Sequence, residues 1–485
     1  MKSRNFVEEK KPEIAGTYPG SIKQALSALS LAMLMASLDT SIVNASLPTF
    51  AQSFDAPFGY VQWIILSYLV TITALMIAAG RLGDILGRKK ILLIGIGIFT
   101  GASVLCGVAP SLWFLIIARM LQGVGGAAMV ALTVGVAGDI VSRERAGTVM
   151  GWLGTMSAVG TTMGPALGGL LTAVADWRAI FLINVPLGFI AIALAKRFLP
   201  SDPTTDLRAD VPVKFDKSGP VLLGLALGMY ALSVTTEAGL TLAALMLLLS
   251  FLGIGFFIAL QRTSASPLLD LSILQDKALR GSLVMSALVA TVMMSTLVVG
   301  PFYLSRVLGL PIYLAGFVLS CGPLIAAISG VPSGRFVDRL GSRRMTFAGL
   351  TAIALGLAGA VAVPIGAGIA GYIVPVGIAT SGYALFQSAN NTAVMAKVSK
   401  ENRGVIAGML SLSRNLGLIT GASVMGAVFA LSVGSDPHLA TADTLSAGFR
   451  STLALAAAIV LCAISFGVFT QISVRLPAFA RLSRR

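Results

Sequence analysis

The chain has few charged residues, few cysteines and almost no histidine. Asp, Glu, Lys and Arg make up 11% of its 485 residues, whereas hydrophobic residues make up 56%. Such a composition is too apolar for a water-soluble domain and predicts an integral membrane protein. The three cysteines, Cys106, Cys321 and Cys462, fall in apolar segments without metal-ligand spacing, and the single histidine, His438, falls in a loop. We therefore expect no disulfide framework, no metal site and no other cofactor.

Long apolar runs, by contrast, are frequent. A helix needs about 20 residues to cross a bilayer, and fourteen runs reach that length. They lie near residues 24–48, 60–80, 91–108, 111–137, 146–172, 177–199, 218–235, 238–260, 279–305, 311–333, 345–364, 368–396, 404–433 and 446–473. The predicted fold class is an all-α membrane protein with fourteen transmembrane helices.

Lys and Arg are distributed unequally over the loops between these runs. If both termini are cytoplasmic, Arg178, Arg306 and Arg450 fall in outside loops, Arg119 and Arg414 fall inside spans, and the rest of the 35 Lys and Arg lie on the cytoplasmic side. This asymmetry predicts that both termini are cytoplasmic. It also accounts for the net charge of +15, so no nucleic-acid partner is needed.

An internal repeat divides the chain into two similar halves. The loop from Gly80 to Lys90 recurs as Gly334 to Arg344, and the glycine spacing of residues 147–164 recurs at 404–421. Two parallel six-helix halves with two helices inserted between them explain this spacing. The expected divisions are a cytoplasmic tail (1–23), a six-helix bundle (24–199), a cytoplasmic linker (200–217), two inserted helices (218–261), a second six-helix bundle (262–474) and a C-terminal tail (475–485).

One carboxylate and one guanidinium stand inside spans of the first half. Asp39 lies in an apolar run, where a charged group costs about 2.5 kcal/mol or more. Arg119 needs an acid, backbone carbonyls or water nearby. We expect Arg119 to modulate the proton affinity of Asp39, directly or through water. The alternative is a structural arginine that extends toward the cytoplasmic side.

The repeated loop carries an acid at the same place in both halves. It contains Gly80, Gly83, Asp84, Gly87 and Arg88, and Asp338 is the counterpart of Asp84. Ordinary cytoplasmic basic residues explain the charge run but not the repeated acid. We predict a cytoplasmic gate, in which the carboxylate accepts hydrogen bonds at a neighbouring helix N-terminus and basic residues pair across the two halves.

A glycine-rich stretch marks the run at 146–172. It holds Gly160, Gly164, Pro165, Gly168 and Gly169. Small residues allow membrane helices to approach closely, and a proline bends the helix that contains it. Close packing alone would explain the first two glycines, whereas the full set favours a hinge or seal between the halves.

Several polar, aromatic or methionine side chains within spans are candidate substrate contacts: Asn44, Trp63, Tyr68, Gln122, Asn184, Met293, Gln387 and Asn390. Hydrogen bonding between helices explains each polar one equally well, and lipid contact explains the methionine. Arg414, beside Asn415, has no explanation beyond a salt link or a carbonyl contact in the second half.

Three of these stretches resemble the motifs of a known family. The segment from Leu38 to Pro48, the stretch at 160–169 and the segment from Asp176 to Gly188 are similar to those of the fourteen-helix drug:proton antiporter family of the major facilitator superfamily. Departures are Ala131, where many relatives have proline, and Ala422, where the second half lacks the proline that follows Gly164 in the first.

The resemblance implies the major facilitator fold, two six-helix bundles plus two inserted helices, in a bacterial inner membrane. It implies a monomer in contact with membrane lipid that exports small lipophilic, often cationic, drugs or antiseptics in exchange for protons by alternating access. Asp39 is then the protonation site, Arg119 its partner, the Gly80 to Lys90 loop a gate and the stretch at 160–169 the antiport element. A cationic substrate would compete with the proton for the Asp39 carboxylate.

Two other transport functions remain open. One is export of lipids or amphiphiles on the same scaffold, and the other is proton-coupled import of a nutrient, for which we would expect more charged side chains in the spans. An enzyme is disfavoured, because the spans contain no paired acids, no histidine and no nucleophile elbow.

Overall fold

The computed structural model describes residues 22–140, 146–202, 216, 218–236, 239–263, 275–396, 403–434 and 440–482. Over these ranges the chain forms helices and turns but no strand, and 14 helical segments are long and apolar enough to cross a membrane. The predicted spans are therefore confirmed. His438, the predicted N-terminal tail up to residue 21 and most of the predicted linker at 200–217 lie outside the described residues.

The first half consists of long helices joined by short ones. Its elements are α1 (Ile22–Ala45), α2 (Leu47–Phe54), α3 (Phe58–Val61), α4 (Trp63–Leu86), α5 (Arg88–Gly107), α6 (Leu112–Ile140), α7 (Ala146–Ala175), α8 (Ala179–Leu182) and α9 (Asn184–Phe198). The helix α1 packs along α7 and also contacts α6 and α9, while α6 packs against α4 and α5. The centre of this half is therefore formed by α1 and α6.

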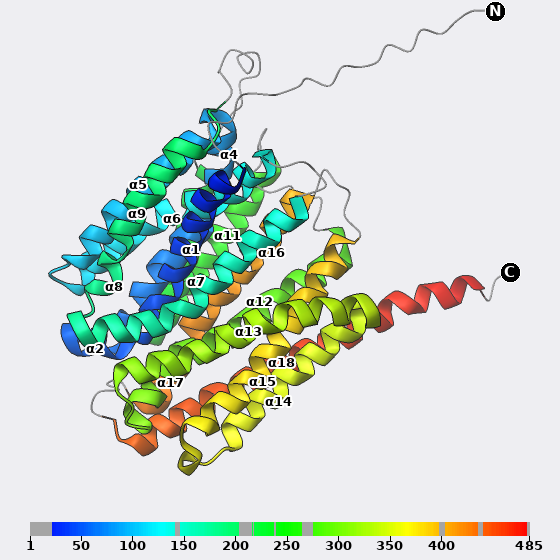
Figure 1. The fold of residues 1–485 in the computed structure, drawn as a ribbon. Helices are drawn as coiled ribbons and strands as arrows, with labels where there is room; N and C mark the ends of the chain where they lie inside the picture. The colour runs from blue at the N-terminus through cyan, green and yellow to red at the C-terminus, as the bar shows by residue number, and fades with distance from the viewer. Residues whose placement is uncertain are drawn as a thin grey trace, which may run out of the picture.

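The second half has the same pattern after an inserted helix pair. The pair is α10 (Ser218–Thr235) and α11 (Leu240–Thr263), and the half comprises α12 (Lys277–Phe302), η3 (Tyr303–Val307), α13 (Ile312–Leu340), α14 (Ser342–Ala362), η4 (Ile365–Ala367), α15 (Gly368–Met395), α16 (Arg403–Thr420), η6 (Gly421–Met425), α17 (Gly426–Val433) and α18 (Ala442–Leu482). In Figure 1 the blue-to-teal helices of the first half lie mostly above the lime-to-red helices of the second, whereas α16, drawn in orange, overlaps the first half in this view.

Helix α18 continues beyond the predicted end of the second bundle at residue 474. It runs to Leu482. Part of the predicted C-terminal tail is therefore helical.

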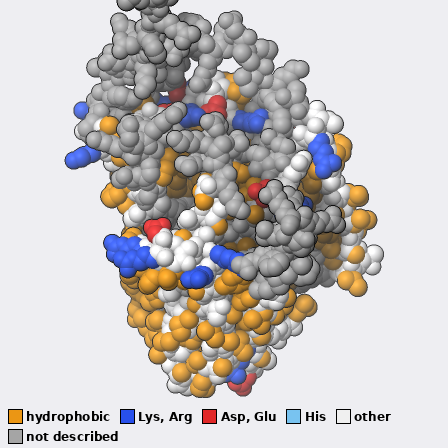
Figure 2. Space-filling view, turned by 90° about the vertical axis from the view of Figure 1, so that its right-hand side faces the viewer, with side chains coloured by type: hydrophobic (Ala, Val, Ile, Leu, Met, Phe, Trp, Pro, Cys, Tyr) orange, Lys and Arg blue, Asp and Glu red, His pale blue; other side chains and the backbone are white. Residues whose placement is uncertain are grey.

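The two ends of the bundle differ in charge. We call the end that carries the turns at Gly87 and Gly341 the basic side, and the end that carries α2, α3 and α8 the far side. Arg88, Lys89 and Arg343 lie beside the basic-side turns. Figure 2, which looks at the right-hand side of Figure 1, shows several groups of Lys and Arg above a largely apolar surface. This is the pattern expected of a protein whose ends lie in water and whose middle lies in lipid.

The halves are in close contact on the far side. Three aromatic rings, Phe58, Phe302 and Phe429, meet there with centroids 5.1 to 5.7 Å apart, and they come from both halves. The backbone N–H of Ala166 in α7 donates to Ser320 Oγ in α13 at 2.9 Å. These contacts close the region between the halves toward the far side.

Helices α7 and α13 separate from each other toward the basic side. Val331 of α13 lies three turns beyond Ser320 on the same face, yet its side chain is 65% exposed, and nearby Ile328 is 67% exposed. Gly154 on α7 has open space around it. The structure therefore shows the halves joined on the far side and separated on the basic side.

Candidate functional site

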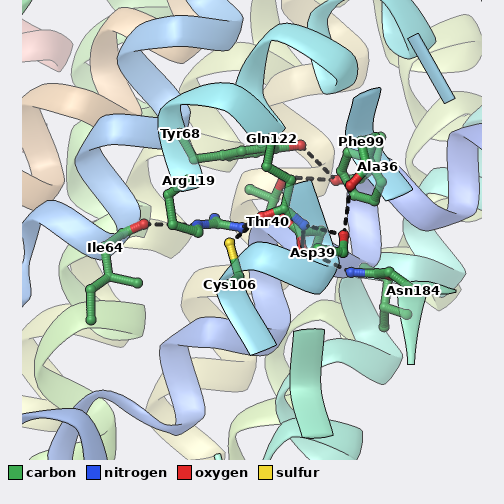
Figure 3. Close-up of polar contacts among 12 residues, drawn as sticks. Ala36, Asp39, Thr40, Ile64, Tyr68, Phe99, Cys106, Arg119, Gln122 and Asn184 are labelled. Carbon is green, nitrogen blue, oxygen red and sulfur yellow. Dashed lines mark hydrogen bonds and ion pairs between the residues drawn. The ribbon is translucent and has the colours of Figure 1, made fainter. Parts of the chain in front are cut away.

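The Asp39 carboxylate lies in the interior of the first half. Its side chain is 0% exposed, and Arg119 Nη1 donates to Asp39 Oδ2 at 2.5 Å. Gln122 Nε2 donates to Asp39 Oδ1 at 2.8 Å, and Asn184 Nδ2 donates to the same oxygen at 3.1 Å. Figure 3 shows these side chains converging from α1, α6 and α9. One cationic and two neutral donors thus surround a single buried carboxylate.

Further contacts fix the Arg119 guanidinium. Its Nε donates to the Ile64 carbonyl at 3.0 Å, and its Nη1 also donates to Gln122 Oε1 at 2.6 Å. Its Cζ lies 4.4 Å from the centroid of the Tyr68 ring, a cation–π arrangement. Arg119 is 1% exposed and lies about two turns from the far-side end of α6. The alternative prediction, an arginine extending to the cytoplasmic side, is therefore wrong.

Two partners of this cluster on α5 were not predicted from the sequence. Gln122 Nε2 donates to Ser103 Oγ at 2.9 Å, and the Cys106 thiol donates to Gln122 Oε1 at 3.6 Å. Ser103 and Cys106 are three residues apart, so they lie on one face of α5. That spacing in an otherwise apolar span was the available signal. The two residues extend the polar cluster from α6 to α5.

The position of this cluster has a consequence for cargo binding. Asp39 faces α6 and α9 of its own half, and its two oxygens already accept three hydrogen bonds. A buried ion pair is stable only when its remaining hydrogen-bonding capacity is used. The expected competition between a cationic cargo and a proton requires a free carboxylate, and here the carboxylate is occupied by protein donors.

The remaining substrate candidates differ in their surroundings. Trp63 Nε1 donates to Thr235 Oγ1 of α10 at 3.0 Å, and Asn390 Nδ2 donates to the Ser282 carbonyl of α12 at 3.3 Å. Asn44 Nδ2 donates to the Thr40 carbonyl within α1 at 3.4 Å. Trp63 Nε1, Asn390 Nδ2 and Asn44 Nδ2 are thus occupied by the protein, whereas Asn44 Oδ1 is buried without a hydrogen-bond partner. Met293 and Gln387 are half-buried, and Met293 packs against the apolar core.

The predicted gate loop contains an ion-pair cluster on the basic side. Arg88 pairs at 2.8 Å with Asp84, one turn earlier, and at 2.8 Å with Asp139 of α6. Its Nη1 also donates to the Gly135 carbonyl at 2.9 Å. All these groups belong to the first half. The expected pairing across the two halves is therefore not made by Arg88 in this structure.

The N-terminus of α5 is capped by an acid that was not predicted. Asp202 accepts from the backbone N–H groups of Lys89 at 2.9 Å and Lys90 at 3.0 Å. Asp84 pairs with Arg88, since a residue four positions away on the helix surface is within reach, and its predicted contact with a helix N-terminus stays a prediction. Gly87 and Gly341 have φ of 103° and 86°, a backbone conformation that favours glycine. The repeated glycine thus serves the turn in each half, and the counterpart acid Asp338 is exposed.

The glycine-rich stretch of α7 packs against helices of both halves. A Cβ atom at Gly160 would lie 2.6 Å from the Leu34 carbonyl. Cβ atoms at Gly164 and Gly168 would likewise overlap Ser41 and Ile42 of α1. A Cβ atom at Gly169 would lie 2.5 Å from the Ile312 carbonyl of α13, and the carbonyl of Pro165 contacts Gly316. Helix α7 therefore lies between α1 and the second half, with glycine at both contacts.

Comparisons with known proteins agree with this architecture. The family model described as Major Facilitator Superfamily matches residues 29–422. The chain belongs to this superfamily. An uncharacterized transporter, YebQ of Escherichia coli, is 32% identical over 405 residues, 83% of this chain and 88% of YebQ. Multidrug resistance protein Stp of Mycobacterium tuberculosis is 31% identical over 430 residues, 85% of this chain and 77% of Stp.

Solved structures of superfamily members share the fold. The crystal structure of the nucleoside transporter NupG matches with a TM-score of 0.65 at 14% identity, covering 92% of this chain and 99% of NupG. The major facilitator fold and the resemblance to the fourteen-helix drug:proton antiporter family are thereby confirmed. The protein is an integral membrane transporter, and the expectation that it is not an enzyme is likewise confirmed.

Proposed function

We propose that this superfamily member is a proton-coupled antiporter that exports lipophilic small molecules by alternating access. The observation that carries the proposal is the Asp39 carboxylate, which is fully buried and paired with Arg119. A carboxylate inside a membrane span is costly and is a candidate proton carrier. The relatives named as multidrug resistance proteins support lipophilic cargo. The excess of Lys and Arg supports a cytoplasmic location of the basic side, and the bacterial relatives support a bacterial inner membrane.

Protonation of Asp39 would leave the buried cluster around it with a net positive charge. The neutral acid no longer offsets the charge of Arg119, which keeps Gln122, the Ile64 carbonyl and the Tyr68 ring as partners. A buried guanidinium without a counter-ion is strongly destabilising. The protonated state therefore favours a different arrangement of α1 relative to α6.

Such a movement has a direct path to the interface between the halves. Helix α1 is in backbone contact with α7 at Gly160 and Gly168, and α7 is in backbone contact with α13 at Gly169. Because glycine leaves no side chain to absorb a shift, a displacement of α1 is passed to α7 and from α7 to the second half. The proposed coupling is therefore indirect, with the proton in the first half and the cargo between the halves.

The experiment uses purified protein in proteoliposomes with a pH-sensitive dye inside and an imposed pH gradient. Addition of a lipophilic substrate should release protons through the wild-type protein, and Asp39→Asn should abolish this release. Asp443→Asn is the matched control, because Asp443 is exposed in the first turn of α18. Gradient-driven export that persists in Asp39→Asn would refute the proposal.

The same vesicles separate the alternative functions. A fluorescent phospholipid that moves between leaflets only with active protein would indicate a lipid exporter. Uptake of a hydrophilic solute down the proton gradient would indicate a nutrient importer. Proton release in response to lipophilic drugs alone supports the proposed antiporter.

A further inference from the structure

Arg414 is a charged side chain on a membrane-spanning helix of the second half. It lies on α16, within the apolar segment Gly408–Val433, and its side chain is exposed. With a rise of 1.5 Å per residue, it lies roughly 9 Å from the basic-side end of that segment. An arginine at such a depth costs several kcal/mol unless it faces water, a partner or a cargo. The structure must therefore supply a reason for it.

Protein partners do not supply the reason. Among the described residues, Arg414 forms neither an ion pair nor a hydrogen bond, and Asp39, the one described carboxylate deep in a span, is taken by Arg119. The other described acids lie in turns or near helix ends: Asp55, Asp84, Asp139, Asp176, Asp202, Asp216, Asp276, Asp338 and Asp443. In the part of the chain that the structure describes, Arg414 thus has no counter-ion.

The neighbours of α16 define where Arg414 points. The Ser413 hydroxyl donates to the Leu283 carbonyl of α12, and Gly417 meets the Ala287 carbonyl of the same helix. Thr420, two turns after Ser413 and on nearly the same side, lies about 120° round from Arg414 and meets Tyr230 of α10.

Arg414 lies on the opposite flank, close enough to Tyr383 of α15 for its charge to act on that side chain. Helix α16 also contacts α4 of the first half. Arg414 therefore borders the space between the halves, on the side where they are separated.

The internal repeat shows that packing does not require this arginine. Gly417 and Gly421 are the counterparts of Gly160 and Gly164, so Arg414 is the counterpart of Ser157. In the first half, Ser157 Oγ simply shares a hydrogen bond of 2.7 Å with Ser37 Oγ of α1. A small hydroxyl is sufficient for helix packing at this position. The guanidinium in the second half is therefore an added charge.

We propose that Arg414 is the anion-binding residue of the cargo site and that the cargo is a lipophilic organic acid. Its guanidinium keeps its charge and presents a planar set of donors that matches a carboxylate, sulfonate or phosphate. The Tyr383 ring of α15, within range of the Arg414 charge, would meet the apolar part of the molecule. This inference rests on the proposed function, since it assigns a chemical class to the exported compound.

The charge balance of the site points against a cationic cargo. A cation entering between the halves would meet the positive charge of Arg414, which repels it. Asp39, the one described carboxylate deep in a span, is occupied in the interior of the first half. Among the described residues, no carboxylate is left to support the preference for cations that the family resemblance implies.

The binding experiment compares three fluorescent probes of equal size in purified wild-type protein without any gradient. The probes are a dansyl-labelled alkyl carboxylate, its methyl ester and the matching quaternary ammonium compound. We expect the carboxylate to bind about tenfold more tightly than the ester, as a charge-assisted hydrogen bond predicts, and the ammonium compound to bind most weakly. Tighter binding of the ammonium compound, or equal binding of acid and ester, would overturn the inference.

Substitutions of Arg414 test whether this residue causes the preference for the carboxylate probe. Arg414→Gln should remove the advantage of the carboxylate over the ester, and Arg414→Lys should keep much of it. Arg262→Gln is the control, because Arg262 is exposed in the last turn of α11. A carboxylate preference that survives Arg414→Gln would overturn the assignment. The comparison of probes on wild-type protein remains decisive if that variant does not fold.

Two further arms separate this inference from its alternatives. Adding phosphatidylglycerol to phosphatidylcholine nanodiscs tests a lipid headgroup as the anion, and competitive loss of probe binding would assign Arg414 to lipid and overturn the inference. Binding needs no proton gradient, so acid-selective binding combined with gradient-independent transport would reject the proposed antiport while supporting the role of Arg414.

Discussion

Replacing Arg119 with methionine would leave the Asp39 carboxylate buried with neutral donors, Gln122 and Asn184. Removing one partner of a buried ion pair costs about 3–5 kcal/mol. Asp39→Asn should also destabilise the protein, because it leaves the guanidinium without a counter-ion. The double variant removes both charges, so its cost should fall below the sum of the two single costs by about 2 kcal/mol or more.

The assay is reversible unfolding of the purified protein in mixed micelles, followed by far-ultraviolet circular dichroism for the four variants of the cycle. Acidic buffer should reduce the cost of Arg119→Met, since the orphaned carboxylate can then take up a proton. The exposed pair of Arg178 and Asp176, 2.8 Å apart, is the control, with an expected coupling below about 1 kcal/mol. Additive costs for Asp39 and Arg119 would refute the reasoning.

Three further changes test the packing. Gly168→Ala should lower the stability of the protein by about 1–3 kcal/mol, because the added methyl group would overlap the Ile42 backbone. Gly101→Ala, whose methyl group would have open space around it, should leave the stability unchanged. Equal melting temperatures for the two variants would contradict this. Asp202→Ala should cost about 0.5–2 kcal/mol by uncapping α5, with Asp443→Ala as the control in the same thermal assay. Trp63→Phe and Thr235→Val should show a coupling of about 1 kcal/mol in a double-mutant cycle, and no coupling would remove the bond between α4 and α10.

The polar site was only partly predictable from the sequence. Asp39 and Arg119 could be paired because few charged groups occur inside spans, and each needs a partner there. Ser103 and Cys106 were missed, since a serine or cysteine in an apolar span is common and carries no charge to signal a role. Gln122 and Asn184 were expected to contact substrate, and the structure places both against Asp39 instead.

The contacts of the gate loop could also be predicted only in part from the sequence. The repeated acid and glycine indicated a structured turn, and the positive φ of Gly87 and Gly341 explains the glycine. The acid that caps α5 could not be predicted, because Asp202 lies beyond α9 in the chain, far from the α5 N-terminus in sequence. Charge and spacing identify candidates for a contact, but the fold selects among them.

The amino-acid sequence by itself determined the membrane location, the fourteen spans and the repeated halves, since each follows from composition or from local runs of residues. The tertiary structure decided which groups surround Asp39, which side of the bundle is closed and why no described carboxylate pairs with Arg414. These features depend on how each helix is rotated and how closely it approaches its neighbours. Spans that are apolar on every face do not encode that rotation in their hydrophobic pattern.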